Sequence, residues 1–147
     1  MAAIQLKIVT PERVVYQETA DQVSLPTKDG EITVLPHHVA LVTVLKPGEV
    51  IIKQGTTQSS VAIFGGFVQV KNDEVTVLTE NAERAEEIDE ARAEAARARA
   101  EQLMTDAKSR DDVDYSRLVG KLERELTRLK VARKRKYKDV GRPGPSQ

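Results

Sequence analysis

The sequence predicts an α+β protein with an N-terminal β-sandwich of about ten strands and a C-terminal antiparallel two-helix hairpin. Residues 1–84 consist of short runs rich in Val, Ile and Thr that alternate between apolar and polar side chains, the pattern of half-buried strands. At about residue 82 this period changes, and residues 82–107 are rich in alanine and contain neither glycine nor proline. Alanine is the best helix former, so the second part of the chain is predicted to be helical.

The expected strands follow one another at short intervals, separated by polar turn signals. In order, the strand runs are IQLKIV, RVVY, DQVSL, EITVL, ALVTVL, EVIIK, SVAIF, FVQV and EVTVLT, with turns expected at TPE, TKDG, KPGE, KQG and KND. Short, regularly spaced strands favour a sandwich or barrel over βαβ units. The segment FGGF places two glycines inside a strand, which predicts a bulge or a close backbone approach. It is not a phosphate loop, because no helix and no G-K-[ST] follow it.

Two helices are expected after the strands. The first covers about 82–107, and the segment KSRDDVD interrupts the pattern, with Asp112 or Asp114 capping the second helix. The second helix runs from Tyr115 to about Tyr137 and has an apolar stripe at spacings of three and four: Leu118, Leu122, Leu126 and Leu129. The predicted organisation is therefore a sandwich at 1–84, a hairpin at 85–137 and a disordered basic tail at 138–147.

The composition argues against several classes of function. The 147 residues carry a formal net charge of zero and no cysteine, which disfavours a globally basic nucleic-acid binder and a thiolate metal site. No apolar run is long enough for a membrane span, and we expect no signal peptide. His37 and His38 are neighbours in a proline-containing turn without an evident third ligand, and no catalytic motif is present. We therefore predict neither catalytic residues nor a metal site.

The predicted hairpin has a weak apolar contact on the side of its first helix. That helix contributes mainly Ile88, Ala91 and Ala95, and burying an alanine methyl stabilises far less than the ~1.5–3 kcal/mol of a leucine. A hairpin held by only a few kcal/mol can adopt two arrangements, between which a ligand selects. The alternative, which the sequence leaves open, is a rigidly docked hairpin.

Arginines line one side of each predicted helix. In the first, Asp89, Arg92, Ala96 and Arg99 share a side, and Glu94 can pair with Arg97. These residues form either a solvated, ion-paired face or a site where Arg92 and Arg99 hold an anion such as a polyphosphate. The second helix carries a similar set, interpreted as a solvated face, a second phosphate clamp or a surface for an acidic partner: Arg117, Arg124 and Arg128.

Four segments in this order are similar to a known family. They are GEITVLPHHVALVTVLKPGEV, FGGFVQVKNDEVTVLTENAERAEEID, IDEARA and DDVDYSR. Together the chain resembles, over about residues 4–137, the epsilon subunit of the bacterial and plastid proton-translocating ATP synthase. It departs from the pattern at Thr33, at His37 and at residues 39–41, where the usual glycines and proline are absent.

The resemblance implies a non-catalytic subunit of the rotating central stalk, with a sandwich that docks on the gamma subunit and the ring of c subunits. A loop carrying Glu31 and His38 would lie at the c-ring. The helices would switch between a compact hairpin and an extended form that inhibits ATP hydrolysis by contacting the beta and alpha subunits. The implied beta-subunit contacts are Arg117, Arg124, Arg128 and Arg133. The protein would be peripheral at the cytoplasmic face of the bacterial inner membrane, through the complex, with no nucleic-acid partner.

The resemblance also implies that the compact hairpin binds ATP as a regulatory ligand, with no required cofactor. By position, the implied ATP-binding residues are Glu83, Ile88, Asp89, Arg92, Ala93, Arg99, Arg124 and Arg128. The alternative interpretation is a free-standing ATP-sensing regulatory module, which would bind ATP without any affinity for gamma.

Overall fold

The computed structural model describes residues 3–106 and 113–140. Its contacts divide the chain into two units, Met1–Arg84 and Ala85–Gln147. The first unit contains eight strands: β1 (Ile4–Val9), β2 (Val14–Ala20), β3 (Gln22–Thr27), β4 (Gly30–Val34), β5 (Leu41–Gln54), β6 (Thr57–Lys71), β7 (Glu74–Leu78) and β8 (Ala82–Arg84).

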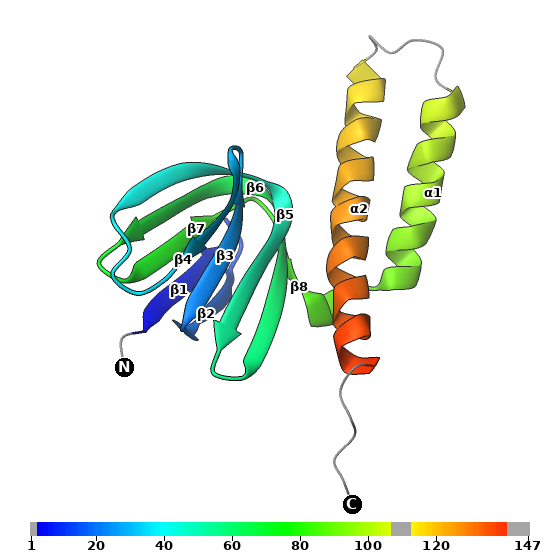
Figure 1. Ribbon diagram of the computed structural model, residues 1–147. Coiled ribbons are helices and arrows are strands. Elements are labelled where there is room, and N and C mark those ends of the chain that lie inside the picture. Colours follow the sequence, from blue (N-terminus) through cyan, green and yellow to red (C-terminus); the bar gives the residue numbers. More distant parts are fainter. Residues whose placement is uncertain (1–2, 107–112, 141–147) are drawn as a thin grey trace, which may run out of the picture. The chain divides into compact units, whose positions relative to one another are not determined.

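The strands form a β-sandwich in which two long strands link the layers. Their order is β2-β1-β7-β6-β5-β3-β4, and β8 pairs with β6. β5 and β6 form a long antiparallel ladder, whereas β1 and β7 are parallel. Figure 1 shows the sheet curling around its core. The α+β fold class predicted from the sequence is confirmed.

Period-two alternation decides which side chains fill this core. Ile4, Leu6 and Ile8 of β1, predicted to share a face, are all at most 1% exposed. The other strands add valines, isoleucines and a leucine to the same cluster, among them Val23, Leu25, Val50, Ile52, Val61, Ile63, Val68, Val70, Val75 and Val77. Full burial of each such side chain stabilises the fold by about 1.5–3 kcal/mol, before the loss of conformational entropy.

The structure has eight strands rather than about ten, because β5 and β6 each join two of the predicted runs. The turn predicted at KPGE is wrong: Pro47 pairs with Phe64 and Gly48 with Ile63 inside the β5–β6 ladder. The FGGF segment is a close approach within β6, as predicted. Gly66 has φ +124°, and a Cβ there would lie 2.1 Å from the carbonyl oxygen of Leu78 on β7.

The second unit contains the short 3₁₀ helix η1 (Ala85–Glu87) and the helices α1 (Glu90–Asp106) and α2 (Val113–Val140). The predicted start of the first helix at about 82 is wrong, since Ala82–Arg84 pairs with β6 as β8. The helix α1 begins after Asp89, whose Oδ1 accepts a hydrogen bond from the Arg92 amide at 3.1 Å. Asp89 is therefore the N-cap of α1.

The boundaries of α2 also differ from the expected ones. The helix begins at Val113, so Asp114 lies inside it and does not cap it, while Asp112 lies outside the described residues. At the other end α2 reaches Val140, beyond the predicted end at Tyr137, because KYKD contains no helix breaker. Residues 138–140 of the predicted tail are therefore helical, and residues 141–147 lie outside the described ones.

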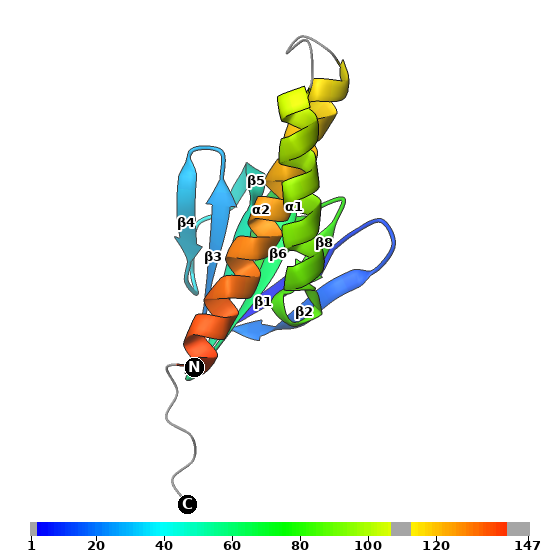
Figure 2. The same ribbon diagram turned by 90° about the vertical axis from the view of Figure 1, so that its right-hand side faces the viewer.

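The two helices lie side by side in both views (Figures 1 and 2). On α1 the buried residues are Ala93 and Ala100. On α2, Leu129, Val131 and Ala132 are buried, but Leu126 of the predicted leucine stripe is 47% exposed. The apolar contact between the helices is therefore thin, as the alanine-rich sequence predicts, because each alanine buries little area.

Candidate functional site

An apolar row crosses the outer face of the sandwich, on the opposite side of the sheet from the core. Strand pairing places Val44 of β5, Phe67 of β6, Leu78 of β7 and Val9 of β1 directly beside one another. Directly paired residues project from the same face of a sheet. Phe67 is 55% exposed and Leu78 is 52% exposed. Val42, on the same face, is 69% exposed. We refer to these five residues as the outer row.

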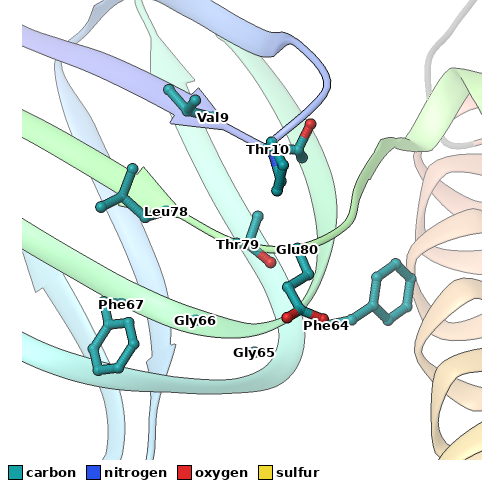
Figure 3. Close-up of a pocket in the computed structure, with 10 residues that line it drawn as sticks. Val9, Thr10, Phe64, Gly65, Gly66, Phe67, Leu78, Thr79 and Glu80 are labelled. Atoms are coloured by element: carbon teal, nitrogen blue, oxygen red, sulfur yellow. The ribbon is translucent and has the colours of Figure 1, made fainter.

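A hollow of about 510 Å³ adjoins the outer row. It is lined mainly by apolar side chains and the glycine pair, at the ends of β1 and β7 and in the middle of β6: Val9, Thr10, Pro11, Phe64, Gly65, Gly66, Phe67, Leu78, Thr79 and Glu80. Figure 3 shows the rings of Phe64 and Phe67 on either side of the glycines. Clustered, exposed apolar side chains of this kind often mark protein interaction sites, whereas single exposed apolar residues are ordinary.

The glycine pair shapes both the outer row and the hollow. Gly65 and Gly66 have φ of +99° and +124°, values that L side chains rarely adopt. Because Gly66 lacks a Cβ, β6 can pass against the backbone of Leu78 and Thr79. This contact sets Phe67 opposite Leu78 in the ladder.

The segment between β4 and β5 exposes further apolar side chains. Leu35 is 52% exposed and Val39 is 76% exposed. His37 has φ +68°, and its amide donates a 2.6 Å hydrogen bond to Asp73 Oδ1 in the β6–β7 turn. That bond holds the strained turn at His37, the position where the family pattern has a glycine. Of the two predicted c-ring contacts, Glu31 is exposed on β4 and His38 lies half-buried in this segment.

The arginines predicted to bind ATP are placed on both helices of the second unit. Arg92 and Arg99 on α1 and Arg124 on α2 are exposed, whereas Arg128 is half-buried with its Nη1 2.5 Å from Glu125 Oε1. The other members of the predicted set are distributed as follows: Ile88 and Asp89 directly precede α1, Ala93 is buried in α1, and Glu83 belongs to β8 in the first unit. Seven of the eight predicted residues thus belong to the second unit, and Glu83 belongs to the first.

The hairpin also contains ion pairs that the sequence only partly predicts. Arg97 pairs with Glu94, as expected, and with Glu101 at 2.8 Å. Hydrogen bonding to Arg97 is the main cause that lowers the pKa of Glu94, and the two carboxylates raise the pKa of Arg97. Arg133 of α2 reaches across to Glu94 of α1 at 3.0 Å. Of the predicted beta-subunit contacts, Arg117 and Arg124 are exposed, while Arg128 and Arg133 engage carboxylates inside the hairpin.

The first unit ends at an arginine anchor. Arg84 donates from Nε and Nη2 to the carbonyl oxygen of Val15, at 3.1 and 2.9 Å, and its guanidinium lies 5.2 Å from the centre of the Tyr16 ring. Burial, followed by hydrogen bonding to Glu18, raises the pKa of Tyr16. This anchor holds β8 against β2 and fixes the chain up to the boundary between the units.

Across residues 3–106 and 113–140, no group of three His, Cys, Asp or Glu side chains is arranged to hold a metal ion. Within the same ranges no helix has the length and hydropathy needed to cross a membrane. The features that the described chain does present are an exposed apolar row beside a hollow on a sandwich, and a helical hairpin whose first helix buries only alanines.

Comparison with known proteins identifies the family. The family model "ATP synthase, Delta/Epsilon chain, beta-sandwich domain" matches residues 3–85, and "ATP synthase, Delta/Epsilon chain, long alpha-helix domain" matches residues 86–133. The chain is 47% identical over 133 residues to the ATP synthase epsilon chain of Herpetosiphon aurantiacus, covering 90% of this chain and 96% of that one. It is 46% identical over 136 residues to that of Dehalococcoides mccartyi, covering 92% and 96%.

Solved structures of ATP synthases contain chains with a similar fold. A chain of the Euglena gracilis mitochondrial ATP synthase, solved with OSCP, F1 and the c-ring, matches with a TM-score of 0.75 and 26% identity, covering 86% of this chain and 79% of that chain. A chain from the central stalk and c-ring of the Tetrahymena thermophila enzyme shares the fold, with a TM-score of 0.53 and 17% identity. The chain belongs to the ATP synthase delta/epsilon family, and is an epsilon-type central-stalk subunit of that complex.

The outer row was not predicted, although the sequence contains a signal for it. In ALVTVL, the outward positions Val42 and Val44 are as apolar as the inward ones. In EVTVL only the last outward residue, Leu78, is apolar, while Glu74 and Thr76 are polar. A strand with one face in water would carry polar residues at the outward positions. The valines of ALVTVL are therefore the signal in the sequence for an apolar outer face.

Proposed function

We propose that this chain is the non-catalytic subunit that couples proton-driven rotation to ATP synthesis and restrains ATP hydrolysis through its C-terminal hairpin. Its working location would be the cytoplasmic face of the bacterial inner membrane, where it would be held peripherally through the complex. The observation that carries this proposal is the combination of an exposed apolar docking face with a hairpin of thin apolar contact, in a member of this family.

The outer row supports docking on the gamma subunit. Phe67 and Leu78 are each about half exposed beside a hollow that a partner's side chain could fill. Large apolar anchors that seat in pockets dominate binding energy at protein interfaces. A rigid sheet presents these anchors without an ordering cost, which favours a stable attachment over a transient one.

The segment between β4 and β5 supports a second contact, with the c-ring. Its exposed Leu35 and Val39 give that segment an apolar surface. The bond from the His37 amide to Asp73 ties the segment to the β6–β7 turn. A preorganised segment loses less conformational entropy on binding, so torque can pass through it with Glu31 and His38 as polar contacts.

The hairpin supports regulation by a change of arrangement. The buried residues of α1 are two alanines, so α1 itself exposes little apolar area when it separates from α2. A small free-energy gap is what a ligand or partner needs in order to shift a population. In an extended arrangement, acidic residues of the beta subunit would be contacted by four arginines of α2. Arg117 and Arg124 are exposed already, and Arg128 and Arg133 would join them.

The test of inhibition compares two forms of the chain added to an ATP synthase catalytic core that lacks epsilon. The full chain should lower ATP hydrolysis, and a form ending at residue 84 should bind the core without lowering it. Competition between the two forms for the same core shows that both occupy one site. Equal hydrolysis with and without the full, bound chain would refute the inhibitory role.

ATP is proposed as the ligand that favours the compact hairpin. The exposed Arg92, Arg99 and Arg124 offer planar, permanently charged groups suited to phosphate oxygens. Calorimetric titration of the full chain with ATP tests this assignment. Saturable binding should be lost in the R92A/R99A variant and kept in R117A, because Arg117 is exposed but outside the predicted set. No heat at millimolar ATP would refute it, and ATP binding without affinity for gamma would favour the free-standing sensor.

A further inference from the structure

An arginine near the end of the described part of α2 is already engaged by two carboxylates of α1. Arg133 Nη2 lies 3.0 Å from Glu94 Oε2, and Arg133 Nε lies 3.5 Å from Glu90 Oε1. The two carboxylates stand at i and i+4, one turn apart on the same face of α1. The planar guanidinium therefore bridges two successive turns of the facing helix.

A third residue holds this arrangement in place. Arg97 pairs with Glu94 and, one turn further on, with Glu101. Glu94 is thus shared between an arginine of its own helix and one of the other helix, and both bonds favour its ionised form. Because Arg97 already holds the Glu94 side chain, that side chain loses less freedom when Arg133 binds, so its carboxylate is preorganised.

This contact matters because α1 contributes little apolar surface to the hairpin. The buried residues of α1 are Ala93 and Ala100, which bury little apolar area. The side chain of Glu90 is only 26% exposed, so its contact with Arg133 is screened less than a fully exposed pair. Arg133 and Glu94 are 59% and 41% exposed, so each pair contributes modestly, and together the pairs favour the closed hairpin over an open one.

We propose that Glu90 and Glu94 form an internal docking site for Arg133. This site binds the Arg133 guanidinium in the closed hairpin and releases it only when the hairpin opens. The site imitates an acidic helix of a partner protein, so the hairpin and an external acidic partner compete for the same side chain. This inference rests on the proposed function in one respect, namely that Arg133 serves as an acid-binding residue of the extended form.

The competition has a thermodynamic consequence that can be measured. A partner that binds Arg133 must first displace two internal carboxylates, so its apparent affinity is reduced by the stability of the closed state. Removing the internal carboxylates should then strengthen binding of an acidic helix. The same removal should increase the open population of the free chain.

The first test measures peptide binding to the full chain, without any other subunit. The probe is a synthetic, glutamate-rich helical peptide, titrated at low salt into wild type, E90Q/E94Q and the charge-matched control E101Q/E123Q. The control residues are both exposed, and Glu101 pairs with Arg97 on its own helix. We expect E90Q/E94Q to bind about 2- to 10-fold more tightly than the control, from two released pairs of partly exposed groups.

A third variant assigns the gain to the proposed residue. Adding R133Q to E90Q/E94Q should abolish the excess affinity over the control. Equal affinities for E90Q/E94Q and E101Q/E123Q, undetectable binding in every variant, or a gain that persists in the R133Q background would each overturn the inference.

The second test measures opening directly. The chain has no cysteine, so spin labels can be placed at A98C on α1 and K121C on α2, two exposed positions. E90Q/E94Q should add a population at longer distance that E101Q/E123Q lacks, and identical distance distributions would contradict the docking site. Because neither measurement involves the enzyme, their outcome is independent of whether the hairpin inhibits ATP hydrolysis, which the truncation experiment decides.

Discussion

Replacing Gly66 by alanine should destabilise the sandwich severely, because two costs act at one position. Gly66 has φ +124°, and an alanine held in such a sparsely populated region costs about 1–3 kcal/mol. The new Cβ would also lie 2.1 Å from the Leu78 carbonyl oxygen and 3.0 Å from Thr79 Cα. Both are backbone atoms, at the last residue of β7 and the residue after it, so the two chain segments must move apart, at about 1–3 kcal/mol for overpacking. We expect a total loss of about 3 kcal/mol or more.

The assay is urea unfolding of the full chain, followed by the amide resonances of Val68 and Val77, which are buried in the sandwich core. A matched control is G55A, since Gly55 has φ +60° but nothing within 4 Å of the added Cβ. The control should lose only the ~1–2 kcal/mol of a left-handed alanine. A loss of less than about 1 kcal/mol in G66A, or equal losses in the two variants, would refute the close-approach argument.

Three further predictions concern single residues. G120A should stabilise α2 by about 1 kcal/mol, because Gly120 lies mid-helix in open space; hydrogen exchange of α2 measures it, and no slowing would contradict it. R84M should destabilise the sandwich by about 2–3 kcal/mol, since it removes two charge-assisted bonds and a cation–π contact. R84K should not restore that stability, and thermal unfolding checks both variants. Tyr16 has a raised pKa, so the stability due to its neutral hydroxyl is complete below pH 10.0 and falls as pH rises through the folded pKa. Ultraviolet titration should show one late tyrosine that Y16F removes, and its absence would sink this prediction.

The sequence predicts the inner half of the sandwich well because alternation reports burial directly. Ile4, Leu6 and Ile8 lie in the core as expected. The turn predicted at KPGE is wrong, because proline and glycine within a long ladder resemble a turn when the partner strand is unknown. There Pro47 pairs with Phe64, and a Cβ at Gly48 would lie 2.9 Å from Pro26, so packing rather than turning requires that glycine.

The start of the helical unit shows tertiary contacts overriding local propensity. The segment AERAEE favours a helix by composition, yet Ala82–Arg84 pairs with β6. The bonds from Arg84 to Val15 join residues far apart in sequence, which no local pattern reveals. For the same reason, the Glu94–Arg97 pair could be predicted from its spacing, whereas the contact between Arg133 and Glu94 could not.

The measurement that tests the central claim most directly is the affinity of purified gamma subunit for this chain and for two variants. F67S/L78S removes apolar side chains from the outer row, and L103S/L126S removes two similarly exposed leucines from the helical unit. Roughly 150–200 Å² of exposed apolar surface on Phe67 and Leu78 corresponds to about 2–4 kcal/mol after binding costs, or about 30- to 1,000-fold in Kd. We predict tight binding by the wild type and by L103S/L126S, with that loss confined to F67S/L78S. Unchanged binding by folded F67S/L78S, or no binding by the wild type, would contradict the account.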